Sequence, residues 1–297
     1  MEEQQNQETH RKNWHDRHYK HLLIIPLVLL LFSLVYLGIF HSKNNDFFYK
    51  DISLTGGTSV TIYEKLNIED LNSFLEGELS EVNLRKISDL ISGEQVAIVV
   101  ETTAESNEAR EVLENYLGYE LTEENSSFEF TGSSLSNAFY RQLIIALFVA
   151  FVFMAIVIFI IFKTPVPSGA VVLAAFADII MTLVTVNILG IKMSSAGIIS
   201  LLMLIGYSVD TDILLTNRVL RRHEGTLNEK LMGSVKTGLT MTLTSLVAVT
   251  VALLVVKSFS ETLNQIFTIL LIGLIFDMLN TWITNVSILK WYVERKK

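Results

Sequence analysis

The feature that most constrains this chain is a series of six apolar stretches, each long enough to cross a membrane, which takes about 20 mostly apolar residues. Half of the 297 residues are hydrophobic, 18% are charged and the mean hydropathy is +0.43. This composition is more apolar than that of soluble domains of similar size. We therefore expect an α-helical polytopic membrane protein. Its six predicted transmembrane helices are residues 22–40, 142–162, 168–190, 195–217, 237–256 and 264–289.

The first span is expected to be a retained anchor. No small-residue cleavage site follows it before polar sequence begins, and it lacks the short basic segment that usually precedes the apolar part of a signal peptide. The domain order is then a tail (1–21), a first helix (22–40), a polar segment (41–138), five further helices (139–290) and a second tail (291–297).

The positions of lysine and arginine predict the orientation. Of 23 such residues, 14 lie in the two tails, at Lys163, at Lys290 or between the fourth and fifth spans, whereas the short loops on the other side hold only Lys192 and Lys257. Because basic loops stay in the cytoplasm, we expect a multi-pass protein of the cell membrane. Both termini would be cytoplasmic, and residues 41–138 would be extracellular.

The extracellular segment is strongly acidic. It carries 19 Asp and Glu residues against six Lys and Arg, a net charge of −13, compared with −8 for the whole chain. Nucleic acid is bound by basic patches, so no nucleic-acid partner is expected. The charge suits either a basic or neutral protein partner or simply a well-solvated surface.

The same segment alternates strand and helix patterns. Helix-like stretches begin with acidic first turns and have apolar residues at helical spacing, while strand-like stretches are rich in β-branched residues. The order β-α-β-β-α-β is that of a ferredoxin-like α/β domain. The predicted elements are residues 58–63, 67–80, 82–88, 95–102, 104–117 and 128–131.

Several kinds of chemistry are not expected. The chain has no cysteine, which excludes disulfides and thiol chemistry, and neither a metal site nor a cofactor is predicted. The histidines of the tail (His10, His15, His18 and His21) fit a membrane-surface segment better than a metal site. An intramembrane aspartyl protease is the main enzyme alternative, but its Tyr-Asp and Gly-x-Gly-Asp motifs are absent.

Aspartates inside the predicted spans are the strongest functional signal. Asp210 and Asp212 lie in the fourth span, Asp178 in the third and Asp277 in the sixth. A charge in hydrocarbon costs about 2.5 to 3.5 kcal/mol on insertion scales, so membrane acids usually face a bundle interior or an ion path. At 100° per residue, Asp210 and Asp212 point about 200° apart and cannot face the same path.

Two interpretations of these acids remain open. Either a carboxyl group exchanges protons as a path opens to one side and then the other, or the acids and their neighbours are hydrogen-bonding contacts between helices. Asp210 is the leading candidate, followed by Asp212, Asp178 and Asp277. Supporting polar residues are Thr182, Asn217 and Asn280, and Arg218 is expected to be an anchor at the cytoplasmic interface.

Several motifs resemble a known family. Residues 51–58, with Asp51, Gly56 and Gly57, resemble a D-F-T-G-G-T motif after the first span, where the Gly-Gly pair fits a tight turn better than a phosphate loop. Gly206-Tyr207-Ser208-Val209-Asp210 resembles a G-Y-S-[IV] motif in the fourth span, and residues 237–242 and 276–282 are similar to the fifth and sixth spans of archaeal members. Together with Arg218 and the order of spans, these residues are similar to the SecF family, in its archaeal form.

This resemblance implies a non-enzymatic role in protein export. SecD and SecF resemble the two halves of an RND-type transporter, associate with a SecYEG-type channel in the lipid bilayer and promote outward movement of unfolded secretory chains, in bacteria with the proton gradient. Here Thr211 stands where the bacterial aspartate aligns, which leaves open which acid takes the relay role. Whether protons or sodium ions are the coupling ion is also open.

Two other functions compete with export. A stand-alone RND-type transporter would normally contain twelve spans, so a chain with six needs a second half, from SecD or from a second copy. A structural assembly or chaperone subunit without ion coupling is the other alternative.

Overall fold

The computed structural model describes residues 21–89, 92–221, 226–256 and 260–296. His10, His15 and His18 lie outside the described residues. Within them, six helices are long and apolar enough to cross a membrane, which confirms the number expected from the sequence. They are α3 (Ile24–Asn44), α7 (Ser133–Phe162), α8 (Pro165–Ile188), α9 (Ser195–Arg221), α10 (Leu227–Val256) and a composite of α11 (Glu261–Leu279), η1 (Asn280–Asn285) and α12 (Val286–Lys296).

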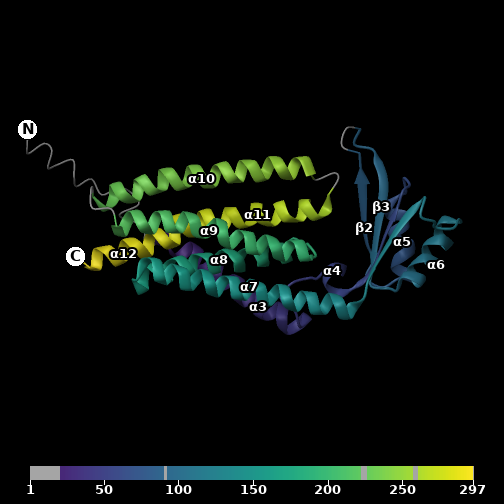
Figure 1. Cartoon of the computed structure of the whole chain (residues 1–297), viewed down its shortest axis with the longest axis horizontal. Coiled ribbons are helices and arrows are strands. Elements are labelled where there is room, and N and C mark those ends of the chain that lie inside the picture. Colours follow the sequence, from purple (N-terminus) through teal and green to yellow (C-terminus); the bar gives the residue numbers. More distant parts are fainter. Residues whose placement is uncertain (1–20, 90–91, 222–225, 257–259, 297) are drawn as a thin grey trace, which may run out of the picture.

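The helices run roughly parallel to one another in a single bundle (Figure 1). Helices α8 and α9 are its most buried members, whereas α7 and α10 expose most of their residues. Helix α9 contacts α7, α8, α10 and α11. The spans predicted from hydropathy are shorter than helices α7 and α10, because both helices begin with polar turns.

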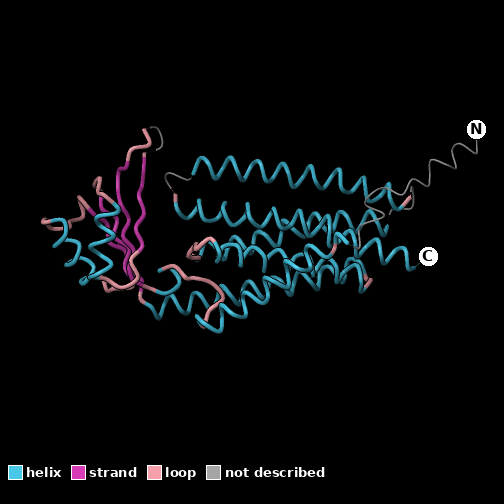
Figure 2. The backbone as a smooth tube through the Cα atoms, turned by 180° about the vertical axis from the view of Figure 1, so that it is seen from behind, coloured by secondary structure: helices cyan, strands magenta, loops and turns pink. Residues whose placement is uncertain are grey.

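A small α/β unit stands at one end of the bundle, between α3 and α7 in the sequence (Figure 1). Its strands form an antiparallel sheet of order β2-β3-β1-β4, and α5 and α6 cover the face turned away from the bundle (Figure 2). The sequence predicted this order of elements. They are β1 (Gly57–Ile62), α5 (Ile68–Glu78), β2 (Asn83–Ser88), β3 (Gln95–Thr102), α6 (Ser106–Leu117) and β4 (Ser126–Thr131).

Alternation along the strands gives the sheet two different faces. Val60 and Val100 are cross-strand partners whose side chains are fully buried with Leu71 and Leu113 of the helices. Because neighbouring residues of a strand point to opposite faces, the intervening positions, such as Glu101, turn toward the bundle. The hydrophobic core therefore lies between the sheet and its two helices, and the polar face looks at the membrane helices.

Residues 45–51, between α3 and α4, form a short strap that joins the sheet to the bundle. Asp51 N donates to Met193 O at 3.0 Å, and Met193 N donates to Tyr49 O at 2.7 Å. Asn187 Nδ2, near the end of α8, donates to Phe47 O at 2.8 Å. These bonds fix the strap to the α8–α9 connection just before the chain enters α4 (Ile52–Thr55) and β1.

Candidate functional site

Three of the four acids singled out in the sequence lie together in the interior of the bundle. Asp178 of α8 and Asp212 of α9 are fully buried, and Asp277 of α11 is 1% exposed. These helices pack against one another at the centre of the bundle, which brings together acids that are far apart in the sequence. We call Asp178, Asp212, Asp277 and the polar residues that bond to them the acid cluster.

Asp178 is bound from two sides. Ser208 Oγ, on α9, donates to Asp178 Oδ2 at 2.6 Å. Asn280 Nδ2, at the start of η1, donates to Asp178 Oδ1 at 2.7 Å. Both donors are fully buried. One carboxyl group thus ties three helices together.

Asp212 has a different set of partners. Thr281 Oγ1 lies 2.9 Å from Asp212 Oδ1, and Asn285 Nδ2 donates to the same oxygen at 2.7 Å. Thr281 Oγ1 also lies 3.2 Å from Asp277 Oδ1. Thr281 is therefore shared between two carboxyl groups, one on α9 and one on its own helix.

The π-helical turn η1 supplies many of the polar side chains that reach the acids. Four of its six residues, Asn280, Thr281, Thr284 and Asn285, are polar and buried. A π turn contains an extra residue relative to an α-helical turn and often occurs at functional sites. Its two apolar residues lie between the polar pairs, and one of them, Trp282, packs instead against α10 at Gly238.

Several buried oxygens beside the acids have no hydrogen-bond partner among the described protein atoms. They include Asp212 Oδ2, Thr216 Oγ1 and Asn285 Oδ1, along with Thr182 Oγ1 on α8. An unmade hydrogen bond of a buried polar group costs about 1–3 kcal/mol. The acid cluster therefore has spare acceptor and donor capacity that a proton, a small cation or water can satisfy.

The fourth acid, Asp210, lies elsewhere. It is exposed on the opposite side of α9 from the buried Asp212, as the 200° separation predicts. Asn217 is also exposed on that side. Arg218 is half-buried, and its Nη1 donates to Gly233 O of α10 at 2.5 Å. The leading candidate of the sequence and two of its supporting residues are thus outside the acid cluster, whereas Asn280 is at its centre and Thr182 is buried beside Asp178 on α8.

Asn285 is a site residue that was not predicted from the sequence. Asn285 lies one turn beyond Thr281, so a polar pair at i, i+4 within an apolar span was the available signal. Ser208 was named in the sequence only as part of the motif at residues 206–210, although its hydroxyl binds Asp178.

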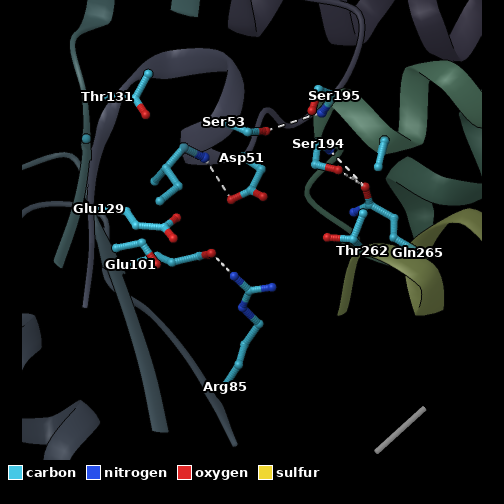
Figure 3. Close-up of a pocket in the computed structure, with 14 residues that line it drawn as sticks. Asp51, Ser53, Arg85, Glu101, Glu129, Thr131, Ser194, Ser195, Thr262 and Gln265 are labelled. Carbon is cyan, nitrogen blue, oxygen red and sulfur yellow. Dashed lines mark hydrogen bonds and ion pairs between the residues drawn. The ribbon is translucent and has the colours of Figure 1, made fainter. Parts of the chain in front are cut away.

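A second polar site lies between the sheet and the bundle (Figure 3). This cleft of about 300 Å³ is lined by Asp51, Arg85, Glu101 and Glu129 on the sheet side and by Ser194 and Gln265 on the bundle side. Glu101 pairs with Arg85, Asp51 accepts from Ile52 N at 2.7 Å, and Gln265 Nε2 donates to Lys192 O at 2.7 Å. Much of its polar lining is therefore already bonded within the protein.

Comparison with known proteins agrees with this architecture. Residues 113–295 match the protein family described as protein export membrane protein SecD/SecF, C-terminal. The protein-export membrane protein SecF of Methanocaldococcus jannaschii is 40% identical over an alignment that covers 93% of this chain and 96% of that protein. SecF of Methanothermobacter thermautotrophicus is 37% identical, with 93% of each chain covered.

Solved structures share the fold. The crystal structure of SecDF, a translocon-associated membrane protein from Thermus thermophilus, matches with a TM-score of 0.69 and 19% sequence identity. The match covers 93% of this chain but 38% of the SecDF chain, so this chain spans less than half of that protein.

Proposed function

The chain belongs to the SecF family of protein-export membrane proteins, which gives it an accessory role in Sec-dependent export, and on this premise we propose how it works. It pairs with a SecD-like membrane subunit beside a SecYEG-type channel and promotes the outward movement of unfolded secretory chains. The acid cluster couples this work to the entry of a cation, in the first instance a proton.

The Thr281 hydroxyl carries the proposal of proton exchange. A hydroxyl has one hydrogen to donate, yet Thr281 Oγ1 is within hydrogen-bonding distance of Asp212 Oδ1 and of Asp277 Oδ1. Both contacts are satisfied only when one of the two carboxyl groups is protonated and donates to Thr281. Loss of that proton breaks one contact, so the packing of α9 against α11 responds to the protonation of the cluster.

The alternative to proton exchange is that the same residues only form hydrogen bonds between helices. Hydrogen bonds between membrane helices are worth about 0.6 kcal/mol on average, and asparagine or serine could supply them without a carboxyl group. Three acids in one buried interior are a costly way to join helices. Asp212 Oδ2 has no hydrogen-bond partner among the described residues, which further favours a carboxyl group that gains and loses a proton or cation over a fully satisfied contact.

The proposed orientation has both termini in the cytoplasm and the α/β unit outside. The uneven distribution of lysine and arginine supports it, as does the position of the unit at the opposite end of the bundle from α12 (Figure 1). The strand order β2-β3-β1-β4, with helices on one face, supports the assignment of the unit as a ferredoxin-like extracellular domain. A stand-alone transporter is less well supported, because six spans match less than half of the SecDF chain.

Replacement of Asp212 by asparagine tests the proton role. The variant Asp212→Asn keeps the size of the side chain and removes titration. Thr281→Val is its matched control because it removes the hydroxyl that contacts Asp212 and Asp277 but no acid. We expect Asp212→Asn, expressed in a host without its own copy, to lower the secreted fraction to the level of the deletion strain, with Thr281→Val intermediate. The proton role is wrong if Asp212→Asn secretes normally.

Recovery of the partner subunit distinguishes a role of Asp212 in ion coupling from a role in assembly of the two subunits. The SecD-like partner should be recovered with Asp212→Asn as fully as with the unaltered chain, since the acid cluster is internal to this subunit. Loss of the partner together with loss of secretion would assign Asp212 a structural role instead.

A further inference from the structure

A pocket opens beside α12, at the end of the bundle that lies away from the α/β unit (Figure 1). It has a volume of about 470 Å³ and is formed at the ends of four helices. Phe162 ends α7, Thr164 precedes α8, Arg221 ends α9 and Lys296 ends α12. We call this site the α12 pocket. Cavities of about 300–1,000 Å³ suit small-molecule ligands.

The α12 pocket has an apolar wall and a basic rim. Phe162 and Val219 in the wall are 6% and 5% exposed, and Val293 is half-buried. Arg221 and Lys296 are exposed at the rim. Among the described residues that line the pocket, none is acidic. A ligand that suits both parts is negatively charged at one end and apolar at the other.

Two cations are held at the rim without a partner carboxylate. Arg221 Nη2 donates to Ile161 O of α7, which uses one of the five N–H groups of the guanidinium. Lys296 Nζ lies 5.8 Å from the centre of the Tyr292 ring. In the described part of the chain, neither Arg221 nor Lys296 forms an ion pair with Asp or Glu. Both can therefore bind an anion.

A buried hydroxyl of the α12 pocket also lacks a partner. Thr164 Oγ1 is buried and has no hydrogen-bond partner among the described residues. Thr164 is the N-cap residue of α8, but its side chain forms no capping bond. Pro165 and Pro167 lie in the first turn of α8 and have no N–H to offer it. The hydroxyl can therefore bond to a group in the pocket, next to the positive end of the α8 dipole.

An apolar groove continues from the pocket along α7. It has a volume of about 540 Å³ and is lined by Phe151, Val152, Ala155, Ile156, Phe159 and Ile160. Phe159 precedes Phe162 by less than one helical turn, so the groove begins next to the pocket. A hydrocarbon chain fits such a groove, whereas an extended peptide would leave backbone N–H and C=O groups unpaired there.

The pocket and the groove together match the charge and shape of a phospholipid. Basic pockets between membrane helices bind the headgroups of anionic lipids. A free phosphate would use only the basic rim and leave the groove empty.

We propose that the α12 pocket binds one anionic phospholipid. Its phosphate contacts Arg221, Lys296 and the Thr164 hydroxyl, and a hydrocarbon chain lies along the groove of α7. This site is separate from the acid cluster and requires neither ion coupling nor a SecD-like partner.

Lipid binding is measured by native mass spectrometry of the full-length protein in detergent. The protein is titrated with phosphatidylglycerol, which is anionic, with phosphatidylcholine, which is not, or with inorganic phosphate. We expect one molecule of phosphatidylglycerol to bind at least about tenfold more tightly than phosphatidylcholine, because each basic residue near an anionic headgroup contributes. Equal binding of the two lipids overturns the inference. Displacement of the lipid by an equal concentration of inorganic phosphate overturns it too, since the site would then be one for a free anion.

Lys296→Gln and Arg295→Gln are a matched pair. Both residues are exposed in the last turn of α12, and each lies over an aromatic ring, but only Lys296 lines the pocket. Lys296→Gln should weaken phosphatidylglycerol binding about fivefold, equivalent to about 1 kcal/mol, and Arg295→Gln less than about twofold. Thr164→Val changes no charge and should also weaken binding about fivefold. The inference is overturned if Arg295→Gln acts as strongly as Lys296→Gln, or if Thr164→Val binds the lipid as tightly as the unaltered chain.

Ala155→Trp tests the position of the hydrocarbon chain. The indole ring would fill the groove on α7, whereas Ala146→Trp lies at an exposed position of the same helix outside the groove. Only Ala155→Trp should weaken phosphatidylglycerol binding, by at least about fivefold, since contact with the lipid chain is lost. If both tryptophan variants bind the lipid alike, the chain does not lie in the groove and the inference is wrong.

Discussion

Asn285 Nδ2 donates to Asp212 Oδ1 at 2.7 Å across the interface between η1 and α9. The two residues are 73 positions apart in the sequence, and both are fully buried. Asn285 follows Thr281 by four residues, so both side chains of η1 reach the same carboxylate oxygen of α9. The acid cluster thus joins the last membrane helix to α9 through two neighbouring turns.

We first predict that Asn285→Leu destabilises the isolated subunit. The substitution leaves Asp212 Oδ1 with one fewer donor in a buried site, which costs about 1–3 kcal/mol. Thermal unfolding in detergent should therefore shift to lower temperature. Asn217→Leu makes the same change on the exposed face of α9 and should leave the unfolding temperature unchanged. Equal effects of the two variants would contradict the assigned role of Asn285.

Packing against the π turn leads to a second prediction. A Cβ atom on Gly238 of α10 would lie 2.4 Å from Trp282 Cζ2 and 3.1 Å from Thr211 Cγ2. Overpacking of this kind typically costs 1–3 kcal/mol, so Gly238→Ala should lower the thermal stability of the subunit in detergent. Gly169→Ala on α8, where an added Cβ meets nothing within 4 Å, is the control. An unchanged unfolding temperature for Gly238→Ala would contradict this packing.

The sequence predicted the six spans and the order of strands and helices because both depend on patterns within about 20 residues. It also predicted that Asp210 and Asp212 lie on different faces, which follows from the rotation per residue alone. The choice of the inward face was not predictable. Both faces of α9 mix polar and apolar residues, with Tyr207 on one and Ser208 on the other, so contacts with α8 and α11 decide the orientation.

The position of the π turn was not predictable from the sequence either. A π turn differs from an α-helix by one residue in the hydrogen-bonding register, and the apolar pattern of residues 264–289 continues through it. Among the polar residues of this span, Asp277 and Asn280 were predicted as site residues, whereas Asn285 was omitted although it follows Thr281 at i, i+4 spacing.

A third prediction concerns the titration of a tyrosine in the α/β unit. Burial and the nearby Glu64 carboxylate raise the pKa of Tyr119, which follows α6, from its usual value of about 10 to about 12. Because the folded state holds the tyrosine proton more tightly than the unfolded state, this contribution to stability is complete below pH 10 and is lost as the pH rises through about 12. Absorbance titration of Glu64→Gln, compared with the unaltered chain and Tyr119→Phe, should show the Tyr119 transition at lower pH. A transition that does not move would exclude the Glu64 contact as a cause.

The last prediction addresses the entry of the chain into the sheet. Gly57 has φ +148°, and an added Cβ would lie 2.2 Å from Thr102 O, a backbone atom of β3 that cannot move without breaking the pairing of β1 with β3. Gly57→Ala should therefore cost about 3 kcal/mol, the upper end of the usual overpacking range.

Gly93→Ala is the matched control, since Gly93 also has a positive φ, +69°, but an added Cβ there meets nothing within 4 Å. It should cost only the backbone strain of about 1–2 kcal/mol. Limited proteolysis of the full-length protein in membranes should cleave the α/β unit faster in Gly57→Ala than in Gly93→Ala. Both substitutions lie within the α/β unit, between α4 and α7. The membrane helices should therefore remain resistant in both variants. Equal cleavage of the α/β unit in the two variants would show that strain, and not the close approach of β1 to β3, sets the requirement for glycine at position 57.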